Sequence, residues 1–186
     1  MGFQDGLTDF GVFYERTYRA AFRVAYGIVG ERGMAEDVTQ DAYVDAYRQR
    51  GRFRGDGSPD AWLYRIVVNG AVSALRRRRV RFVQPLDPAT VERPGGLDVA
   101  SSAMGHVVLA DGLRRLDARA RSAVVLRYYL DLDYATIGSI IGASPENVGA
   151  ILSRSLDRLR GLIEPDASPP AVRAAATREA GRHGTP

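Results

Sequence analysis

Apolar residues recur with the spacing of an α-helix over two separate stretches of this chain, residues 8–82 and 107–163. Between them, residues 83–106 are rich in Pro, Gly and Ser and show little periodicity, and residues 164–186 are short of large apolar side chains. No stretch alternates in the manner of a β-strand. The pattern predicts an all-α fold in which two small helical domains are joined by a flexible linker and followed by a disordered tail.

The composition argues against an enzyme. The chain has no cysteine and only two histidines, His106 and His183, both in stretches with little helical pattern. We therefore expect neither a metal centre nor histidine-based catalysis, and no nucleophile or acid/base pair stands out elsewhere. No cofactor is expected either.

The N-terminal residues lack the basic start and apolar core of a signal peptide. No run approaches the roughly 20 apolar residues of a membrane span. We expect a cytoplasmic protein without a membrane span. All 26 residues counted as Lys or Arg are arginine, and the net charge is +4. Arginine supplies planar, permanently charged donors suited to phosphates and base edges, although charge alone does not identify the partner.

Two sets of residues recur every four positions between residues 34 and 46 and define two faces of one helix. The apolar set is Met34, Val38, Ala42 and Ala46, and the acidic set is Asp37, Asp41 and Asp45. Like charges at this spacing cost an isolated helix about 0.2–0.5 kcal/mol per pair. The acidic face is therefore either a solvated surface or a site for a positively charged partner.

A loop and a helix are predicted in the stretch FRGDGSPDAWLYRIVVNGAVSALRRRR, residues 53–79. Ser58 can cap the helix, Pro59 suits its first position and Asp60 complements its dipole. The apolar face that follows consists of Leu63, Ile66, Val67, Gly70, Ala71 and Ala74. We expect Trp62 to pack in the core.

The end of this helix is strongly basic, with arginines at positions 76, 77, 78, 79 and 81. The positive charges of such a cluster repel one another, so the arginines must face open solvent or bind a polyanion. Because a Gly-rich loop lies nearby, we favour nucleic acid as the partner. Asn69 contributes little to helix stability. Its carboxamide offers a hydrogen-bond donor and an acceptor, so it can recognise the edge of a base.

Residues 116–163 have the pattern of helix, helix, short turn and helix. Asp117 can cap a helix over residues 118–130 and Asp133 one over residues 134–141, and Ser144-Pro145 can start a third after Gly142. The predicted core is Ile137, Ile140, Ile141, Val148, Leu152 and Leu159. This is the arrangement of a DNA-binding helix-turn-helix, although three-helix units also serve as protein-docking modules.

Two blocks of the sequence carry a family resemblance. AEDVTQDAYVDAYRQRGRFRGDGSPDAWLYRIVVN, residues 35–69, resembles conserved region 2 of the extracytoplasmic-function (ECF, group IV) sigma factors of the sigma-70 family. LRYYLDLDYATIGSIIGAS, residues 126–144, resembles their region 4. The order of the blocks, the intervening linker and the total length agree with the family, and the resemblance covers about residues 8–163.

The resemblance implies a dissociable subunit that directs core RNA polymerase to promoters and helps to open them. It implies that the helix carrying Asp37, Gln40, Asp41 and Tyr43 docks on the clamp helices of the β′ subunit. An anti-sigma factor would be a further partner.

In region 2, the resemblance implies a pocket for a flipped-out base of the −10 element. This pocket would be formed by the loop Phe53, Arg54, Gly55 and Asp56 together with Asn69. The phosphates near the pocket would be held by Arg76, Arg77, Arg78 and Arg79.

In region 4, the helix beginning at Pro145 would read the −35 element and contact the β flap. The implied DNA-binding residues are Asn147, Gly149, Ala150, Ile151, Arg154 and Arg158. Where the family usually has a basic residue, then Ser and Arg, this chain has Gly149, Ala150 and Ile151. Two donors are missing, so we expect an atypical or weakly demanded −35 element, with methyl contacts to thymine in their place.

Two alternatives remain at this point. A stand-alone helix-turn-helix regulator would bind DNA without polymerase. A degenerate sigma factor would bind polymerase without initiating transcription.

Overall fold

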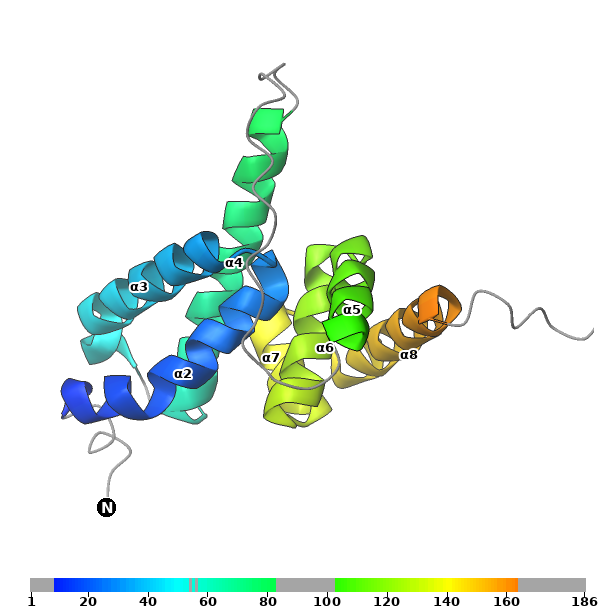
Figure 1. Ribbon diagram of the computed structural model, residues 1–186. Helices are drawn as coiled ribbons and strands as arrows, with labels where there is room; N and C mark the ends of the chain where they lie inside the picture. The colour runs from blue at the N-terminus through cyan, green and yellow to red at the C-terminus, as the bar shows by residue number, and fades with distance from the viewer. Residues whose placement is uncertain (1–8, 54, 56, 83–102, 164–186) are drawn as a thin grey trace, which may run out of the picture.

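The computed structural model describes residues 9–53, 55, 57–82 and 103–163, and every regular element in them is a helix (Figure 1). The N-terminal half contains α2 (Phe10–Val29), α3 (Arg32–Gln49), the short 3-10 helix η1 (Arg50–Arg52) and α4 (Pro59–Phe82). The C-terminal half contains α5 (Ala103–Arg115), α6 (Ala118–Leu130), α7 (Tyr134–Ile141) and α8 (Pro145–Ile163). The predicted all-α fold is confirmed. Among the described helices, none is both long and apolar enough to cross a membrane.

One predicted boundary is wrong. Residues 103–106 were expected to belong to the linker, but α5 begins at Ala103, so His106 lies in a helix. Ala and Met are good helix formers, which outweighs the single Gly105 in this turn. The rest of the predicted linker and the predicted tail lie outside the described residues.

Side-chain caps begin the helices where the sequence predicts them. The Ser58 hydroxyl accepts from the Ala61 amide at 3.1 Å, the Asp117 carboxylate from Ala120 at 2.9 Å and the Asp133 carboxylate from Thr136 at 2.8 Å. The hydrogen bonds from Thr136 also lower the pKa of Asp133. Each cap satisfies a backbone donor that the helix itself cannot pair, which stabilises the start of the helix.

In the N-terminal half, α2, α3 and α4 pack against one another through the predicted apolar faces. Val38, Ala42 and Ala46 of α3 are buried, as are Leu63 and Val67 of α4. Complete burial of an aliphatic side chain such as Leu63 stabilises the fold by roughly 1.5–3 kcal/mol.

A bidentate ion pair ties α2 to the start of α4. The Arg16 guanidinium donates to the two Asp60 carboxylate oxygens at 2.7 and 2.8 Å. This hydrogen bonding raises the pKa of Arg16. Asp60 therefore stabilises the N-terminus of α4 through the helix dipole, as predicted, and also holds α2 against α4 through its ion pair with Arg16.

The C-terminal half is a helix-turn-helix with a supporting α5 and α6. Ile137 and Val148 are completely buried, and Ile140, Leu152 and Leu159 are nearly so, as predicted. Ile141, the sixth residue of the predicted core, is only partly buried. Gly142 ends α7 with φ 68°, a left-handed conformation that favours glycine. Only the short turn of residues 142–144 separates α7 from α8.

The two halves are docked on each other. Figure 1 shows α2 and α4 of the N-terminal half beside α6 and α7 of the C-terminal half, and buried residues of both halves form one apolar cluster. At the α2–α6 contact, a Cβ atom added to Gly27 would lie 2.9 Å from Cγ2 of Val125. Only a glycine permits this approach without displacement.

A buried arginine joins the halves at the same place. Arg121 of α6 is 7% exposed, and its guanidinium donates to the carbonyl oxygens of Ile28, Arg114 and Leu116. Ile28 lies in the last turn of α2, whereas Arg114 and Leu116 lie at the end of α5. Burial, reinforced by the nearby charge of Arg114, lowers the pKa of Arg121.

We predict that Arg121→Met lowers the free energy of unfolding by about 3 kcal/mol, because three carbonyl groups lose a charged donor. Urea unfolding followed by circular dichroism measures the change. The matched control is Arg158→Met, an exposed arginine of α8, which should change stability by less than about 0.5 kcal/mol. Equal effects of the two variants would contradict this role of Arg121.

Candidate functional site

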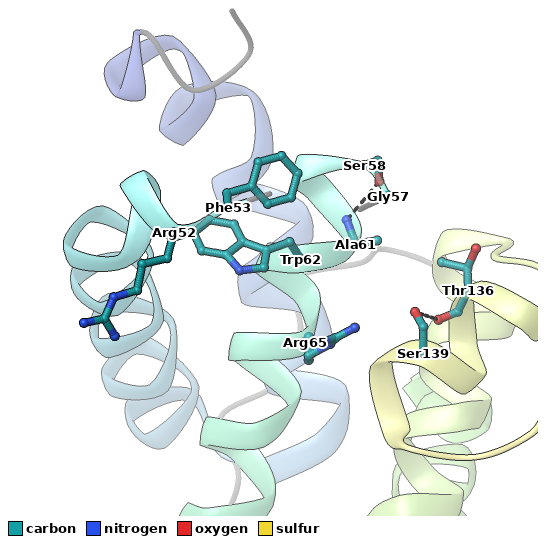
Figure 2. A pocket seen from close by; sticks show the side chains of 9 residues that line it. All are labelled: Arg52, Phe53, Gly57, Ser58, Ala61, Trp62, Arg65, Thr136 and Ser139. Atoms are coloured by element: carbon teal, nitrogen blue, oxygen red, sulfur yellow. Dashed lines mark hydrogen bonds between the residues drawn. The ribbon is translucent and has the colours of Figure 1, made fainter. Parts of the chain in front are cut away.

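A cavity of about 540 Å³ lies between the start of α4 and α7 (Figure 2). Its lining residues come from η1 and the following loop, from the first turns of α4 and from α7: Arg52, Phe53, Gly57, Ser58, Ala61, Trp62, Arg65, Thr136 and Ser139. Figure 2 shows Arg65 directed toward α7, while Arg52 points away. The cavity thus combines aromatic, hydroxyl and cationic groups, which suits a nucleobase and its phosphate.

The aromatic wall of the cavity consists of Phe53 and Trp62, whose ring centroids lie 5.4 Å apart. Trp62 is only partly buried, so it packs against the core, as predicted, and also faces the cavity. In the loop between the two aromatic residues, Gly55 and Gly57 have positive φ angles of 78° and 98°. Glycine adopts these angles without steric penalty.

The predicted base pocket is only partly assembled in this arrangement. Phe53 lines the cavity, whereas Asn69 lies further along α4, is exposed and is not among the lining residues. Gly55 is half-buried in the loop. Arg54 and Asp56 were also predicted to contribute, but they lie outside the described residues.

Exposed polar residues continue from the cavity along α4. Arg65, Asn69 and Arg76 are exposed and follow one another at intervals of four and seven residues, so they lie on one face of the helix. Figure 1 shows that the last turns of α4 extend beyond α2 and α3.

The predicted phosphate-binding arginines, Arg76, Arg77, Arg78 and Arg79, are all exposed. Arg78 pairs with Glu31 at 3.1 Å and so also fixes α4 to the start of α3.

The acidic face of α3 is exposed. Asp37, Gln40 and Asp41 point to solvent, opposite the buried apolar face of the helix. Tyr43 differs from the prediction that it presents its side chain to a partner, because it is only 4% exposed. Its hydroxyl hydrogen-bonds with the Thr17 hydroxyl at 2.6 Å, and burial raises its pKa to about 12. Tyr43 therefore holds α3 against α2.

The exposed face of α8 carries Asn147, Ala150, Arg154 and Arg158. The Arg154 guanidinium donates to the Ala150 carbonyl at 3.1 Å, so it lies back along the helix. Ile151 is half-buried and packs against the core, which leaves only part of its side chain for another contact. Of the three unusual positions, Ala150 is the one that is open.

Gly149 is covered by an aromatic ring from α7. A Cβ atom added to Gly149 would lie 3.3 Å from Cε2 of Tyr134, whose side chain is 44% exposed. The Tyr134 ring therefore occupies part of the space that a larger residue at position 149 would need. The helix-turn-helix presents this ring beside its exposed face.

Of the residues that line the cavity, Phe53 alone was predicted as a site residue, and Arg65, Thr136 and Ser139 are among those that were not. Arg65 could have been found, because it stands four residues before Asn69 on the same helix. Thr136 and Ser139 carry no such signal, since they face the cavity only because α7 docks on α4. Their place depends on tertiary structure.

Comparison with known proteins places these surfaces in a family. Residues 13–81 match Sigma-70 region 2, and residues 106–159 match Sigma-70, region 4. The ECF RNA polymerase sigma factor BldN of Streptomyces coelicolor is 29% identical over 170 residues, which cover 88% of this chain and 64% of BldN. The chain thus spans slightly less than two thirds of that relative.

A second relative is matched over more of its length. The ECF RNA polymerase sigma factor SigK of a Mycobacterium species is 30% identical over 167 residues, covering 82% of this chain and 80% of SigK.

Among solved structures, the sigma factor RpoE from Bartonella quintana, in complex with the anti-sigma factor NepR, matches with a TM-score of 0.72 and 24% identity. The match covers 85% of this chain and 98% of RpoE, and it shows a common fold.

Two sigma-70 regions in this order within one helical chain define an RNA polymerase sigma factor. The identity to SigK and BldN is more specific. The chain belongs to the ECF sigma factors, as the resemblance of residues 35–69 and 126–144 indicated.

The contact between Tyr134 and Gly149 can be measured by a mutant cycle. We predict that Gly149→Ala is nearly neutral in the native chain, because about 1 kcal/mol of helix propensity is offset by displacement of the ring. In a Tyr134→Ala background the same change should stabilise by about 1 kcal/mol. Urea unfolding provides both values.

The control for this cycle is Gly161→Ala, also in α8, where nothing lies within 4 Å of an added Cβ. Its effect should be the same in both backgrounds. If Gly149→Ala also had one effect in both backgrounds, the ring would not restrict position 149.

Proposed function

We propose that this sigma factor binds core RNA polymerase through the acidic face of α3 and reads promoter DNA through α4 and α8. The observation that carries the proposal is the segregation of charge in the N-terminal half. Asp37 and Asp41 are exposed along α3, whereas Arg76, Arg77 and Arg79 are exposed at the end of α4. One half can therefore hold a basic protein surface and a nucleic-acid backbone at the same time.

The polymerase-binding surface consists of Asp37, Gln40 and Asp41, with Tyr43 beneath them as support. The clamp helices of β′ are the proposed partner. Complementary charge steers the encounter and fixes its register, which makes the repulsion between the aspartates tolerable in the complex.

The −10 element is bound at the start of α4 and along its exposed face. A flipped-out base enters beside Phe53 and Trp62, with Asn69 and Arg65 along the strand and the arginines at the end of α4 on its phosphates. Extruding a base costs a few kcal/mol, which stacking and a preformed pocket offset.

The −35 element is read by α8, and the C-terminal half contacts the β flap. The exposed groups on this helix are Asn147, Ala150, Arg154 and Arg158. With Gly149 covered by Tyr134 and Ile151 half-buried, few donors face the DNA. This supports a −35 element that is read through phosphates and thymine methyl groups more than through guanine.

The protein acts in the cytoplasm as an initiation factor and not as an enzyme. An anti-sigma factor is a fitting regulatory partner, because RpoE, which shares the fold, was solved with one.

Run-off transcription on fragmented genomic DNA of the source organism, with purified core polymerase, tests the function. Sequencing of the 5′ ends should reveal start sites that require this protein and share an upstream motif. Binding to core without new start sites would instead indicate a degenerate sigma factor. DNA binding without any binding to core would indicate a stand-alone regulator.

Two substitutions on α4 should separate base reading from phosphate binding. We predict that Asn69→Ala reduces transcription selectively at one −10 position. Arg77→Ala should weaken all promoter variants equally and lower the slope of log affinity against log salt by about 1. Transcription from a set of −10 variants at several salt concentrations measures both. Equal losses for both variants on every promoter would contradict these roles.

A further inference from the structure

We propose that the cavity between α4 and α7 binds a free nucleoside monophosphate whose base carries an amino group, such as adenosine monophosphate. The cavity is lined by residues of both halves of the chain, which offer an aromatic wall, a cation and hydrogen-bond acceptors to one ligand. The inference goes beyond the proposed function, because a free nucleotide is a ligand of the sigma factor itself and not a part of the promoter.

The size and the aromatic wall of the cavity suit a nucleobase. Its volume of about 540 Å³ lies within the roughly 300–1,000 Å³ of small-molecule sites. Phe53 and Trp62 line it with ring centroids 5.4 Å apart and ring planes inclined at 48°. Every base has a π-face that stacks on aromatic side chains. Because the two planes are inclined, a flat base stacks on one ring and meets the other at an angle.

The charge of the cavity favours an anion. Among the described residues of the lining, Arg52 and Arg65 are charged and none is acidic. Figure 2 shows Arg52 pointing away and Arg65 directed toward α7, so Arg65 is the cation inside. No described residue forms a hydrogen bond or an ion pair with the Arg65 guanidinium. Arg65 is therefore available for a phosphate, which an arginine can bind with two parallel hydrogen bonds.

The wall formed by α7 presents hydrogen-bond acceptors. The Thr136 hydroxyl donates to the Asp133 carboxylate at 3.0 Å, and the Ser139 hydroxyl donates to the Thr136 carbonyl at 2.8 Å. Since a hydroxyl has a single proton, each of these oxygens has only its lone pairs left for a ligand. The α7 wall therefore favours a base with an amino group, which donates, over a base with a carbonyl oxygen at the same place.

These three features occur together in a nucleotide and not in other small anions. A sugar phosphate carries the anion but lacks a ring for the aromatic wall. An aromatic amino acid has a ring and a carboxylate, but its ammonium group would enter a lining that already holds Arg65 and, among its described residues, has no acidic side chain to pair with it. The cavity thus selects a stacking base joined to a phosphate.

Trp62 makes the site directly observable, because it is the single tryptophan of the chain. A base that stacks in the cavity should quench its fluorescence. We expect titration of the full chain with adenosine monophosphate, without DNA or polymerase, to give saturable quenching with a Kd below about 1 mM. N-acetyltryptophanamide, titrated in parallel, corrects for absorption by the nucleotide. Quenching that does not saturate would overturn the proposal.

The variant Arg65→Gln tests the phosphate contact. We expect it to bind adenosine monophosphate at least fivefold more weakly and to bind adenosine, which has no phosphate, with unchanged affinity. The matched control is Arg19→Gln, an exposed arginine of α2 outside the lining, which should bind both ligands as the native chain does. Equal affinity of the native chain for the two ligands would overturn the proposed contact.

The variant Ser139→Ala tests the α7 wall. The native chain should bind adenosine monophosphate at least fivefold more tightly than inosine monophosphate, which has a carbonyl in place of the amino group. This ratio should fall below twofold in Ser139→Ala and stay unchanged in Ser153→Ala, which alters an exposed serine of α8. Both substitutions introduce a better helix former, so neither should impair folding. An unchanged ratio in Ser139→Ala would overturn the role of the α7 wall.

A dinucleotide of adenine distinguishes a free nucleotide from one within a strand. It is too short to extend from Arg65 to Arg76, about 16 Å further along α4 at roughly 1.5 Å per residue. We expect the dinucleotide to quench Trp62 with at least threefold lower affinity than adenosine monophosphate. Tighter binding of the dinucleotide would assign the cavity to a nucleic-acid strand and overturn the proposal.

These titrations are independent of the test of the proposed function, because they use neither polymerase nor promoter. A chain that bound adenosine monophosphate but initiated no transcription would overturn the proposed function and support the nucleotide site. A chain that initiated transcription but showed no saturable quenching would overturn the nucleotide site alone.

Discussion

The buried guanidinium of Arg121 is the contact on which the arrangement of this chain depends. The last carbonyl groups of a helix have no partner within it and carry the negative end of its dipole. Arg121 donates to such groups at the ends of both α2 and α5. A single charge therefore satisfies two helix termini that belong to different halves, and it orients α6 between them.

The burial pattern of α2 reflects this double role. Near its start, the buried residues Phe13 and Thr17 lie one turn apart on a single face. Near its end, Val24 and Ala25 are buried, and so are Ile28 and Val29, which widens the buried arc. The first part of the helix serves the N-terminal half alone, whereas the last part packs against both halves.

Local signals in the sequence predict the helices well and their assembly poorly. The caps at Asp117 and Asp133 and the apolar spacing predict α6 and α7 to the residue. By contrast, nothing in the sequence distinguishes Arg121 from a surface arginine. Tyr43 was predicted to lie on the exposed acidic face of α3 and to contact a partner there. Both are buried because groups far along the chain meet them: the Ile28 carbonyl and the Thr17 hydroxyl.

The docked arrangement leaves the acidic face of α3 open. Figure 1 shows α3 on the side of the N-terminal half away from α5–α8. Asp37, Gln40 and Asp41 are exposed on this helix, whereas Val38 and Ala42 are buried in the core. A partner that binds only the acidic face would meet the same surface whether or not the two halves are docked, so its binding would not by itself shift the equilibrium between those arrangements.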